Sequence, residues 1–210
     1  MKKIIYAAGL ALCLSLASIS SSAIASEGLD VPKNTVKQIL ETKHPTPYSQ
    51  ITTYSNGSAS GVDFSEATFY DEAGNVIEPP MDSDTDLVTP LASGTSEGTW
   101  SNGSGYSCVK KVKVLAWYAY PSIEMGFYAD FCINSGATAY DTISDVYLPI
   151  MSFPNWENLT RQLTKTETLD SPASGGYSAK VKRTASSNYT LEHVYLKVQK
   201  DSYKVETSFK

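Results

Sequence analysis

The sequence is poor in the residues that most often bind metals or act as nucleophiles and bases. Its 210 residues include three cysteines and two histidines, and these follow no CxxC or zinc-type spacing. The P-loop, the dinucleotide-binding glycine fingerprint and the HExxH motif are also missing. We therefore expect no metal site, no cofactor and no standard enzyme activity.

Positive charge is scarce as well, since the chain carries a formal net charge of −5. A protein that binds nucleic acid needs clustered lysine and arginine to neutralise phosphates. We therefore expect no nucleic-acid partner. Apart from the N-terminus, the sequence has no long apolar run, so the remainder of the chain is predicted to be soluble.

The N-terminus has the order of regions that is typical of a secretory signal. Two lysines open the chain, residues 4–17 are apolar, and an A-x-A pattern ends at Ala25. This order predicts a signal peptide over residues 1–25, cleaved between Ala25 and Ser26. A membrane anchor is the alternative, but the apolar run is shorter than the roughly 20 residues that span a bilayer.

Charge divides the rest of the chain into two parts. Residues 26–97 contain 12 acidic and three basic residues, whereas residues 98–210 have a net charge of +2. We interpret residues 26–97 as an acidic, partly disordered α/β extension and linker, with a short helix that includes Val36, Ile39 and Leu40. An alternative is a propeptide that covers a basic surface formed by Lys110, Lys111, Lys113, Lys180, Lys182 and Arg183.

Residues 98–210 show the two-residue alternation of β-strands. Val194, Leu196 and Val198 alternate with polar residues, and we count Glu192, Lys197 and Gln199 among these polar residues. A hairpin around Lys200 and Asp201 sets Val198 opposite Tyr203 and Leu196 opposite Val205 on one buried face. Several more short strand patterns, separated by turn residues, predict an antiparallel β-sandwich or barrel-like domain.

Cys108 and Cys132 are the two cysteines outside the signal, and they are predicted to form a structural disulfide across a hairpin. In that register the residue numbers of each opposite pair sum to 240, so Val109 faces Phe131 and Val112 faces Tyr128. The same rule sets Leu115 opposite Met125 and Trp117 opposite Ile123. Lys111 and Lys113 fit the apolar face poorly, which predicts a bulge or an exposed edge there. Secretion supplies the oxidising compartment that such a bond needs.

The tip of this hairpin is rich in aromatic residues: Trp117, Tyr118 and Tyr120 surround its turn. In one interpretation Trp117 folds back onto the core and the tyrosines cover the end of the sandwich. In the other the three rings form an exposed patch that binds sugar rings or a membrane interface.

Motifs for hydrolysis and calcium binding occur only in part. Ser96 lies in a G-x-S-x-G pattern, but the strand and helix of a nucleophile elbow are not predicted around it. The available bases are His44 and His193, and His193 is expected on the polar side of its strand beside Tyr195 and Lys197. Glu167 and Asp170 could pair as carboxylates, but they border a turn without apolar neighbours.

Asp82, Asp84 and Asp86 begin like a calcium-binding loop. Leu87 takes the place of the required glycine, and Ser93 takes the place of the bidentate glutamate. We interpret this segment as a solvated acidic linker.

The sequence contains the segments FYDEAGNVI, LASGTSEGTWSNGSGYSCVKKVKV, GFYADFCINSG followed by YDTISDVY, and SPASGGYSAKVKRT. In this layout it resembles small secreted all-β proteins of Gram-positive bacteria that have no assigned activity. The resemblance covers roughly residues 65–210 and consists of turns and strands. It implies an extracellular bacterial β-domain and assigns no functional residue.

The function expected from the sequence is non-catalytic: a secreted module that binds cell-wall or other extracellular glycans. A membrane-active toxin or bacteriocin-like protein is the alternative, with the aromatic tip inserting into a membrane surface. A hydrolase ranks third.

Overall fold

The computed structural model describes residues 38–79, 97–99, 108–134, 140–200 and 202–209, with the backbone alone for residues 97–99. These residues belong to one compact unit, Val36–Lys210. They form strands in two antiparallel sheets, and the described residues include no helix. The prediction of an all-β, antiparallel, sandwich-like fold is confirmed.

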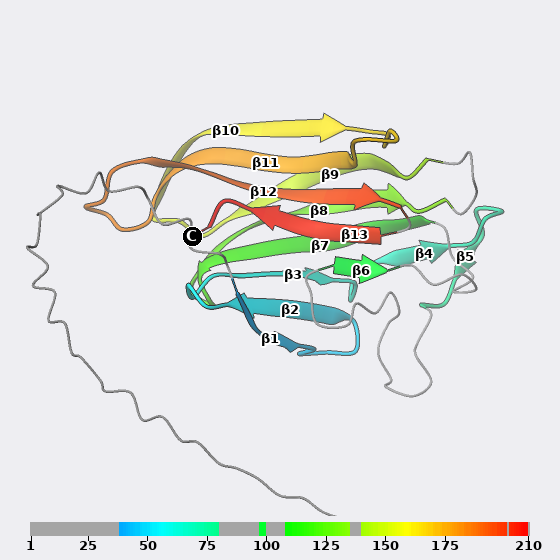
Figure 1. The fold of residues 1–210 in the computed structure, drawn as a ribbon, viewed down its shortest axis with the longest axis horizontal. Coiled ribbons are helices and arrows are strands. Elements are labelled where there is room, and N and C mark those ends of the chain that lie inside the picture. The colour runs from blue at the N-terminus through cyan, green and yellow to red at the C-terminus, as the bar shows by residue number, and fades with distance from the viewer. Residues whose placement is uncertain (1–37, 80–96, 100–107, 135–139, 201, 210) are drawn as a thin grey trace, which may run out of the picture. The chain divides into compact units, whose positions relative to one another are not determined.

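The first sheet is built around the two long strands of the disulfide hairpin (Figure 1). β7 pairs with β8 on one side and with both β3 and β4 on the other, and β9 pairs with β8. Its strands are β1 (Ile39–Lys43), β2 (Ser49–Tyr54), β3 (Ala59–Asp63), β4 (Thr68–Tyr70), β5 (Val76–Ile77), β7 (Cys108–Ala119), β8 (Ile123–Cys132) and β9 (Thr142–Met151).

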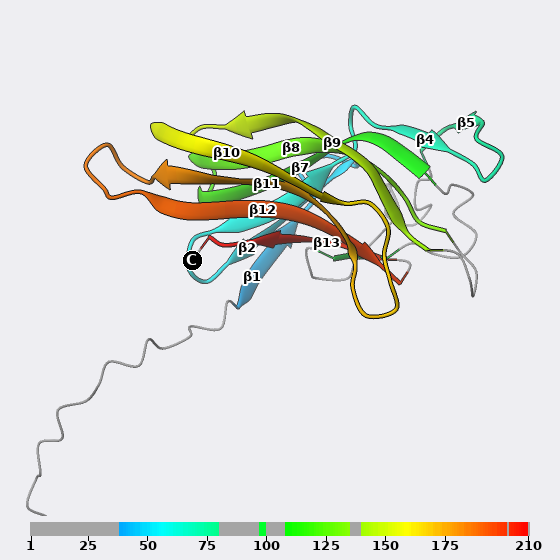
Figure 2. The ribbon, with the colours of Figure 1, turned by 90° about the horizontal axis from the view of Figure 1, so that it is seen from above.

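The second sheet has the order β10-β11-β12-β13-β6 and lies over the first as a second layer (Figure 2). Its strands are β10 (Asn155–Thr164), β11 (Ala173–Lys182), β12 (Thr190–Gln199), β13 (Ser202–Thr207) and β6 (Glu97–Thr99). The predicted hairpin register is confirmed, because Val198 pairs with Tyr203 and Leu196 pairs with Val205.

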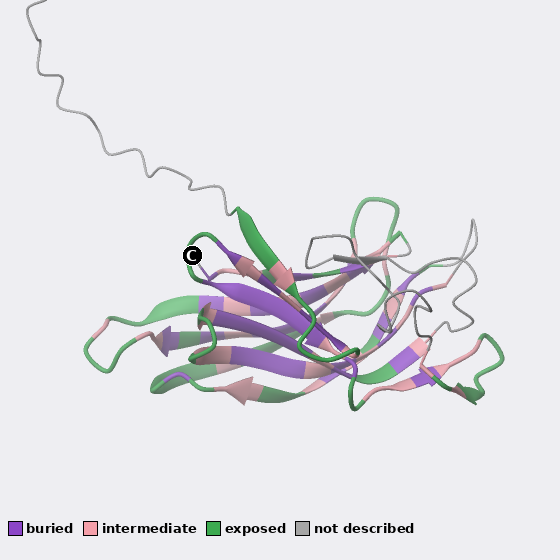
Figure 3. Ribbon diagram, turned by 90° about the horizontal axis from the view of Figure 1, so that it is seen from below, coloured by how far each residue is buried: buried purple, intermediate pink, exposed green. Residues whose placement is uncertain are grey.

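Alternate side chains of both sheets form the core between the layers. Figure 3 shows buried residues along strands of both sheets. The two-residue period of a strand sends every second side chain inward, so each long strand contributes several apolar residues to one core. The largest of its fully buried apolar side chains are Phe69, Phe127, Phe131, Phe209, Met125, Ile133, Ile143 and Leu196.

The N-terminal part of this unit corrects the sequence interpretation. Ile39 and Leu40 lie in strand β1, not in the expected helix. β2 offers a free edge to this short segment, and a helix of so few residues gains too little to nucleate. Residues 39–77 likewise do not form a separate extension, because β3 and β4 pair directly with β7.

The predicted disulfide joins facing residues of β7 and β8, Cys108 and Cys132, whose Cα atoms are 4.0 Å apart. Val109 faces Phe131 as predicted. A bulge at Lys111, whose φ is 61°, then shifts the register by one residue. Its backbone N–H donates to Asp130 Oδ1 at 2.8 Å.

The bulge was expected from the sequence, but the pairs predicted beyond it are wrong. Val112 faces Ala129, where Tyr128 was expected, and Ala116 is the residue that faces Met125. Trp117 faces Glu124, not Ile123.

Replacing both Cys108 and Cys132 by serine should lower the free energy of unfolding by roughly 3 kcal/mol, because the unfolded chain regains the freedom of the closed loop. Denaturant unfolding of the oxidised protein and the double variant measures the difference. Reduced wild-type protein is the control and should match the variant. Equal midpoints for the oxidised protein and the variant would contradict the prediction.

Candidate functional site

The aromatic tip predicted from the sequence does not present its rings together. Trp117 has 4% of its surface exposed, and its Nε1 donates to Glu124 Oε2 at 3.0 Å. Tyr120 meets the indole edge-on, with ring centroids 5.2 Å apart, and keeps 37% of its surface exposed. The indole therefore packs against the first sheet in a small cluster with Ala59 and Leu115, apart from the core onto which the first interpretation folded it.

Tyr118, the third residue of the tip, is also drawn into the fold. It packs against the core, and the Arg183 guanidinium lies 4.2 Å from its ring centroid. The Phe209 ring meets it edge-on at 6.5 Å. Of the three tip residues, only Tyr120 remains exposed.

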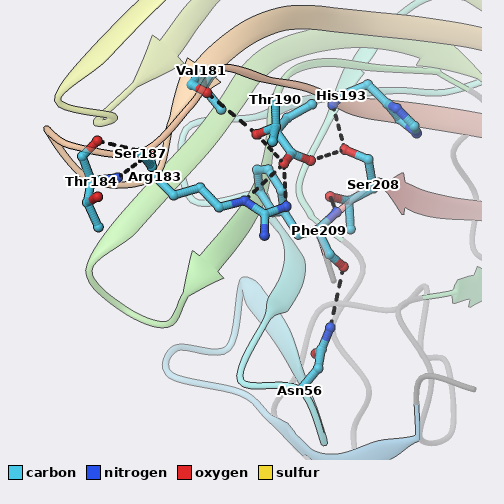
Figure 4. A network of polar contacts seen from close by, with 11 residues as sticks. Asn56, Val181, Arg183, Thr184, Ser187, Thr190, His193, Ser208 and Phe209 are labelled. Carbon is cyan, nitrogen blue, oxygen red and sulfur yellow. Dashed lines mark hydrogen bonds and ion pairs between the residues drawn. The ribbon is translucent and has the colours of Figure 1, made fainter. Parts of the chain in front are cut away.

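Beside Tyr118, a buried polar network closes one end of the sandwich (Figure 4). Glu192, with 2% of its surface exposed, forms an ion pair with Arg183. Thr190 Oγ1 also donates to Glu192 Oε1 at 3.0 Å, and Ser208 Oγ donates to Oε2 at 2.6 Å. Both carboxylate oxygens thus accept hydrogen bonds from the protein, and the network is structural.

The placement of Glu192 corrects a prediction. Glu192 has the same strand parity as Val194 and so points inward, whereas the sequence interpretation grouped it with the outward polar residues. Burial acts to lower the pKa of Arg183, but the hydrogen bond and the negative charge of Glu192 raise that pKa above its ordinary value. Arg183 therefore stays positively charged.

The outer face of the second sheet carries a different set of side chains. From Glu192 to Val198, the even-numbered residues of β12 point inward, and the odd-numbered residues of the strand point outward. We call the outward series the β12 face; it consists of Tyr189, which directly precedes the strand, and Leu191, His193, Tyr195 and Lys197. Leu191 and Tyr189 have 67% and 43% of their surfaces exposed.

The middle of the β12 face is a stack of side chains along the strand. The rings of His193 and Tyr195 are stacked with centroids 4.9 Å apart, and Lys197 Nζ lies 5.6 Å from the Tyr195 centroid. Glu206 of β13 is 3.7 Å from Lys197 Nζ and 3.9 Å from His193 Nε2. Burial lowers the pKa of His193, although the charge of Glu206 opposes this. Near pH 7 the imidazole is therefore mainly neutral.

Gly176 of β11 lies opposite Tyr195 and makes this arrangement fit. Its φ is 158°, and an added Cβ would lie 2.1 Å from the Val194 carbonyl oxygen and 2.8 Å from Tyr195 Cδ1. Only glycine leaves room for this close approach. The register places uncharged polar residues of β10 and β11 on the same face: Thr160, Gln162, Ser174 and Ser178.

The remaining sequence candidates are not brought together. Ser96, Asp82, Asp84 and Asp86 lie outside the described residues. His44 follows β1 of the first sheet, whereas His193 lies on β12 of the second, on its outward side as predicted.

Glu167, which the sequence analysis considered together with Asp170 as a pair of carboxylates, has a structural contact. Its Oε2 accepts a hydrogen bond from the backbone N–H of Lys200 at 3.1 Å.

The lysines and arginine of the predicted basic surface are also divided. Lys110, Lys111 and Lys113 lie on β7 of the first sheet, Lys180 and Lys182 on β11 of the second, and Arg183 in the buried pair.

Within the described ranges, no group of three or more histidine, cysteine or acidic side chains is arranged to hold a metal ion. The part of the chain that the structure describes contains no helix with the length and apolarity to cross a bilayer. The chain matches no protein-family model, no curated protein and no solved structure. The β12 face is the candidate site because of the exposure and stacking of its side chains.

Proposed function

We propose that this chain is a secreted, non-catalytic protein that binds glycans of a cell wall or another extracellular surface through the β12 face. The observation that carries the proposal is the combination of aromatic and uncharged polar side chains on one outward-facing sheet surface. Sugars have apolar C–H faces that pack on rings and hydroxyls that pair with small polar groups.

Each part of the β12 face has a role in this proposal. Tyr189 presents ring surface at one end, although Lys182 Nζ covers part of it at 5.1 Å. The stack of His193 and Tyr195 presents ring edges, a phenol hydroxyl and a neutral imidazole. Those groups donate to and accept from sugar hydroxyls. The strand holds the side chains at fixed spacing, which limits the entropy lost on binding.

Secretion also belongs to the proposal. The disulfide is compatible with an oxidising compartment, and the N-terminal sequence has the order of a signal peptide. The alternative of a membrane-active toxin relied on an exposed aromatic tip. The burial of Trp117 takes away its main support.

The test is co-sedimentation of the oxidised protein with isolated Gram-positive cell walls and insoluble polysaccharides. Replacing Tyr189 and Tyr195 together by alanine should weaken binding at least about tenfold, since truncated aromatic anchors commonly cost 1–2 kcal/mol or more. The matched control replaces Tyr120 and Tyr140, two exposed tyrosines off the β12 face, and should bind like wild type.

Three results would count against the proposal. Wild-type protein that sediments with none of these glycans overturns it altogether. Loss of binding in the Tyr120 and Tyr140 variant alone moves the site off the β12 face, to the surface around one of these two tyrosines. Release of sugar from the glycans would show that the protein is an enzyme.

A further inference from the structure

Two lysines face each other on the outer surface of β12 and β13. Lys197 and Lys204 occupy directly opposite positions in the antiparallel register, and both point away from the core. Like charges in such a pair repel at a Cβ separation of about 5 Å. The chain places them together although its net charge is −5. Glu206 offsets part of this repulsion, since it lies 3.7 Å from Lys197 Nζ, and an anion bound between the two lysines would relieve the rest.

A hollow of about 470 Å³ lies at this pair and extends toward the hairpin turn. Its volume falls in the range of small-ligand sites. It is lined by Pro172, Lys197, Gln199, Lys200, Ser202, Tyr203, Lys204 and Glu206. Among these described residues three are lysines and one is acidic, so the hollow carries an excess of positive charge.

The hollow is continuous with the β12 face, because Lys197 belongs to both. Lys197 Nζ lies 5.6 Å from the Tyr195 ring centroid and 3.7 Å from Glu206 Oε1, and 21% of the Lys197 side chain is exposed. A chain of sugars packed along His193 and Tyr195 would therefore reach the lysines with its next units.

We infer that the glycan is anionic, and that one of its carboxylate, sulfate or phosphate groups binds between Lys197 and Lys204. This inference rests on the proposed function, and it names the substrate class of the same site. Lysine binds such groups as a compact point charge, so the site is expected to select charge rather than one oxyanion geometry.

A polysaccharide fits better than an anionic membrane. Membrane binding through lysines gains from apolar side chains that insert beside them. Leu191, the most exposed apolar residue of the β12 face, lies six residues from Lys197, which is about 20 Å along a strand. The other groups that line the hollow near the lysines are mainly polar, as hydrogen bonding to sugar hydroxyls requires.

The experiment compares polymers that differ only in charge. Polygalacturonate is paired with its methyl ester, and dextran sulfate with dextran. At low salt the oxidised wild-type protein should bind at least one anionic polymer about tenfold more tightly than its neutral partner. Raising the salt to about 0.5 M should remove the difference, because exposed charges are screened.

The test variant replaces Lys197 and Lys204 by alanine, and it should lose the preference for the charged polymer. The control replaces Lys110 and Lys113 by alanine, which changes the net charge equally on the first sheet. It should keep the preference. Unfolding midpoints of both variants should match wild type, which excludes loss of fold as the cause.

The outcomes separate this inference from the proposed function. Equal binding to charged and neutral polymers, or a preference that survives the Lys197 and Lys204 substitutions, overturns the inference and leaves glycan binding intact. Failure to bind any of the four polymers or cell walls overturns both. Binding to vesicles of 30% phosphatidylserine without binding to either anionic polymer assigns the lysines to a membrane, which also overturns it.

Discussion

Glu192→Ala should lower the free energy of unfolding by about 3 kcal/mol. The substitution leaves the Arg183 guanidinium without its counter-charge at the closed end of the sandwich. It also removes the acceptor for Thr190 and Ser208. We expect the lower end of the range for broken buried pairs, because 26% of the Arg183 side chain reaches solvent. Denaturant unfolding with equal m-values measures the loss.

A second variant separates the lost charge partner from lost packing. Replacing Arg183 by methionine and Glu192 by leucine removes both charges and keeps most of the volume. This double variant should be more stable than Glu192→Ala alone, because no unpaired charge stays in the network. If Glu192→Ala unfolds at the wild-type midpoint, the carboxylate is not the partner that the structure indicates.

The alternation of apolar and polar residues allowed the β12–β13 hairpin of the second sheet to be predicted from the sequence. Val194, Leu196 and Val198 point inward, and the short turn at Lys200 leaves one register that buries them against Tyr203 and Val205. The disulfide hairpin was predicted correctly only up to Lys111. A bulge adds one residue to one strand, and the alternation of apolar and polar residues does not determine the position of that extra residue.

The first three strands gave a weaker signal, because several of their buried side chains are polar. Thr52 and Ser60 face each other in register, and both are fully buried. Their hydroxyls are satisfied within the sheet: Thr52 Oγ1 is 3.1 Å from the Thr42 hydroxyl, and Ser60 Oγ is 2.9 Å from the Tyr54 hydroxyl. Buried serine and threonine look like loop residues in a sequence. These strands were therefore interpreted as an extension.

The candidate site was misplaced for a related reason. Sequence patterns showed that Trp117 lies near a turn, but not that its indole packs on the outer face of the first sheet against Ala59 and Leu115. The outward direction of His193 and Tyr195 could be predicted. The stacking of their rings could not be predicted, because it depends on the absence of a side chain at Gly176 of the neighbouring strand.

Phe209→Ala should lower the free energy of unfolding by about 3–5 kcal/mol, because it leaves a ring-sized cavity in the core. The ring has 1% of its surface exposed and meets the Phe153 ring at 5.9 Å between centroids. Phe209→Leu fills most of that volume and should recover much of the loss. Trp156→Ala is the control, since 47% of that residue is exposed and its loss should cost far less. Equal midpoints for the Phe209 and Trp156 variants would contradict the placement of Phe209 in the core.

The losses at Phe209 and Glu192 should not add. Ser208, the residue before Phe209, donates its hydroxyl to Glu192 and accepts from the His193 backbone N–H at 2.8 Å. Tyr118 contacts both Phe209 and Arg183. Each substitution therefore removes a contact of groups shared by both sites, namely Ser208 and Tyr118. A double-mutant cycle should give a coupling energy of at least about 0.5 kcal/mol. Strict additivity would mean that the polar network and the aromatic core stabilise the end of the sandwich independently.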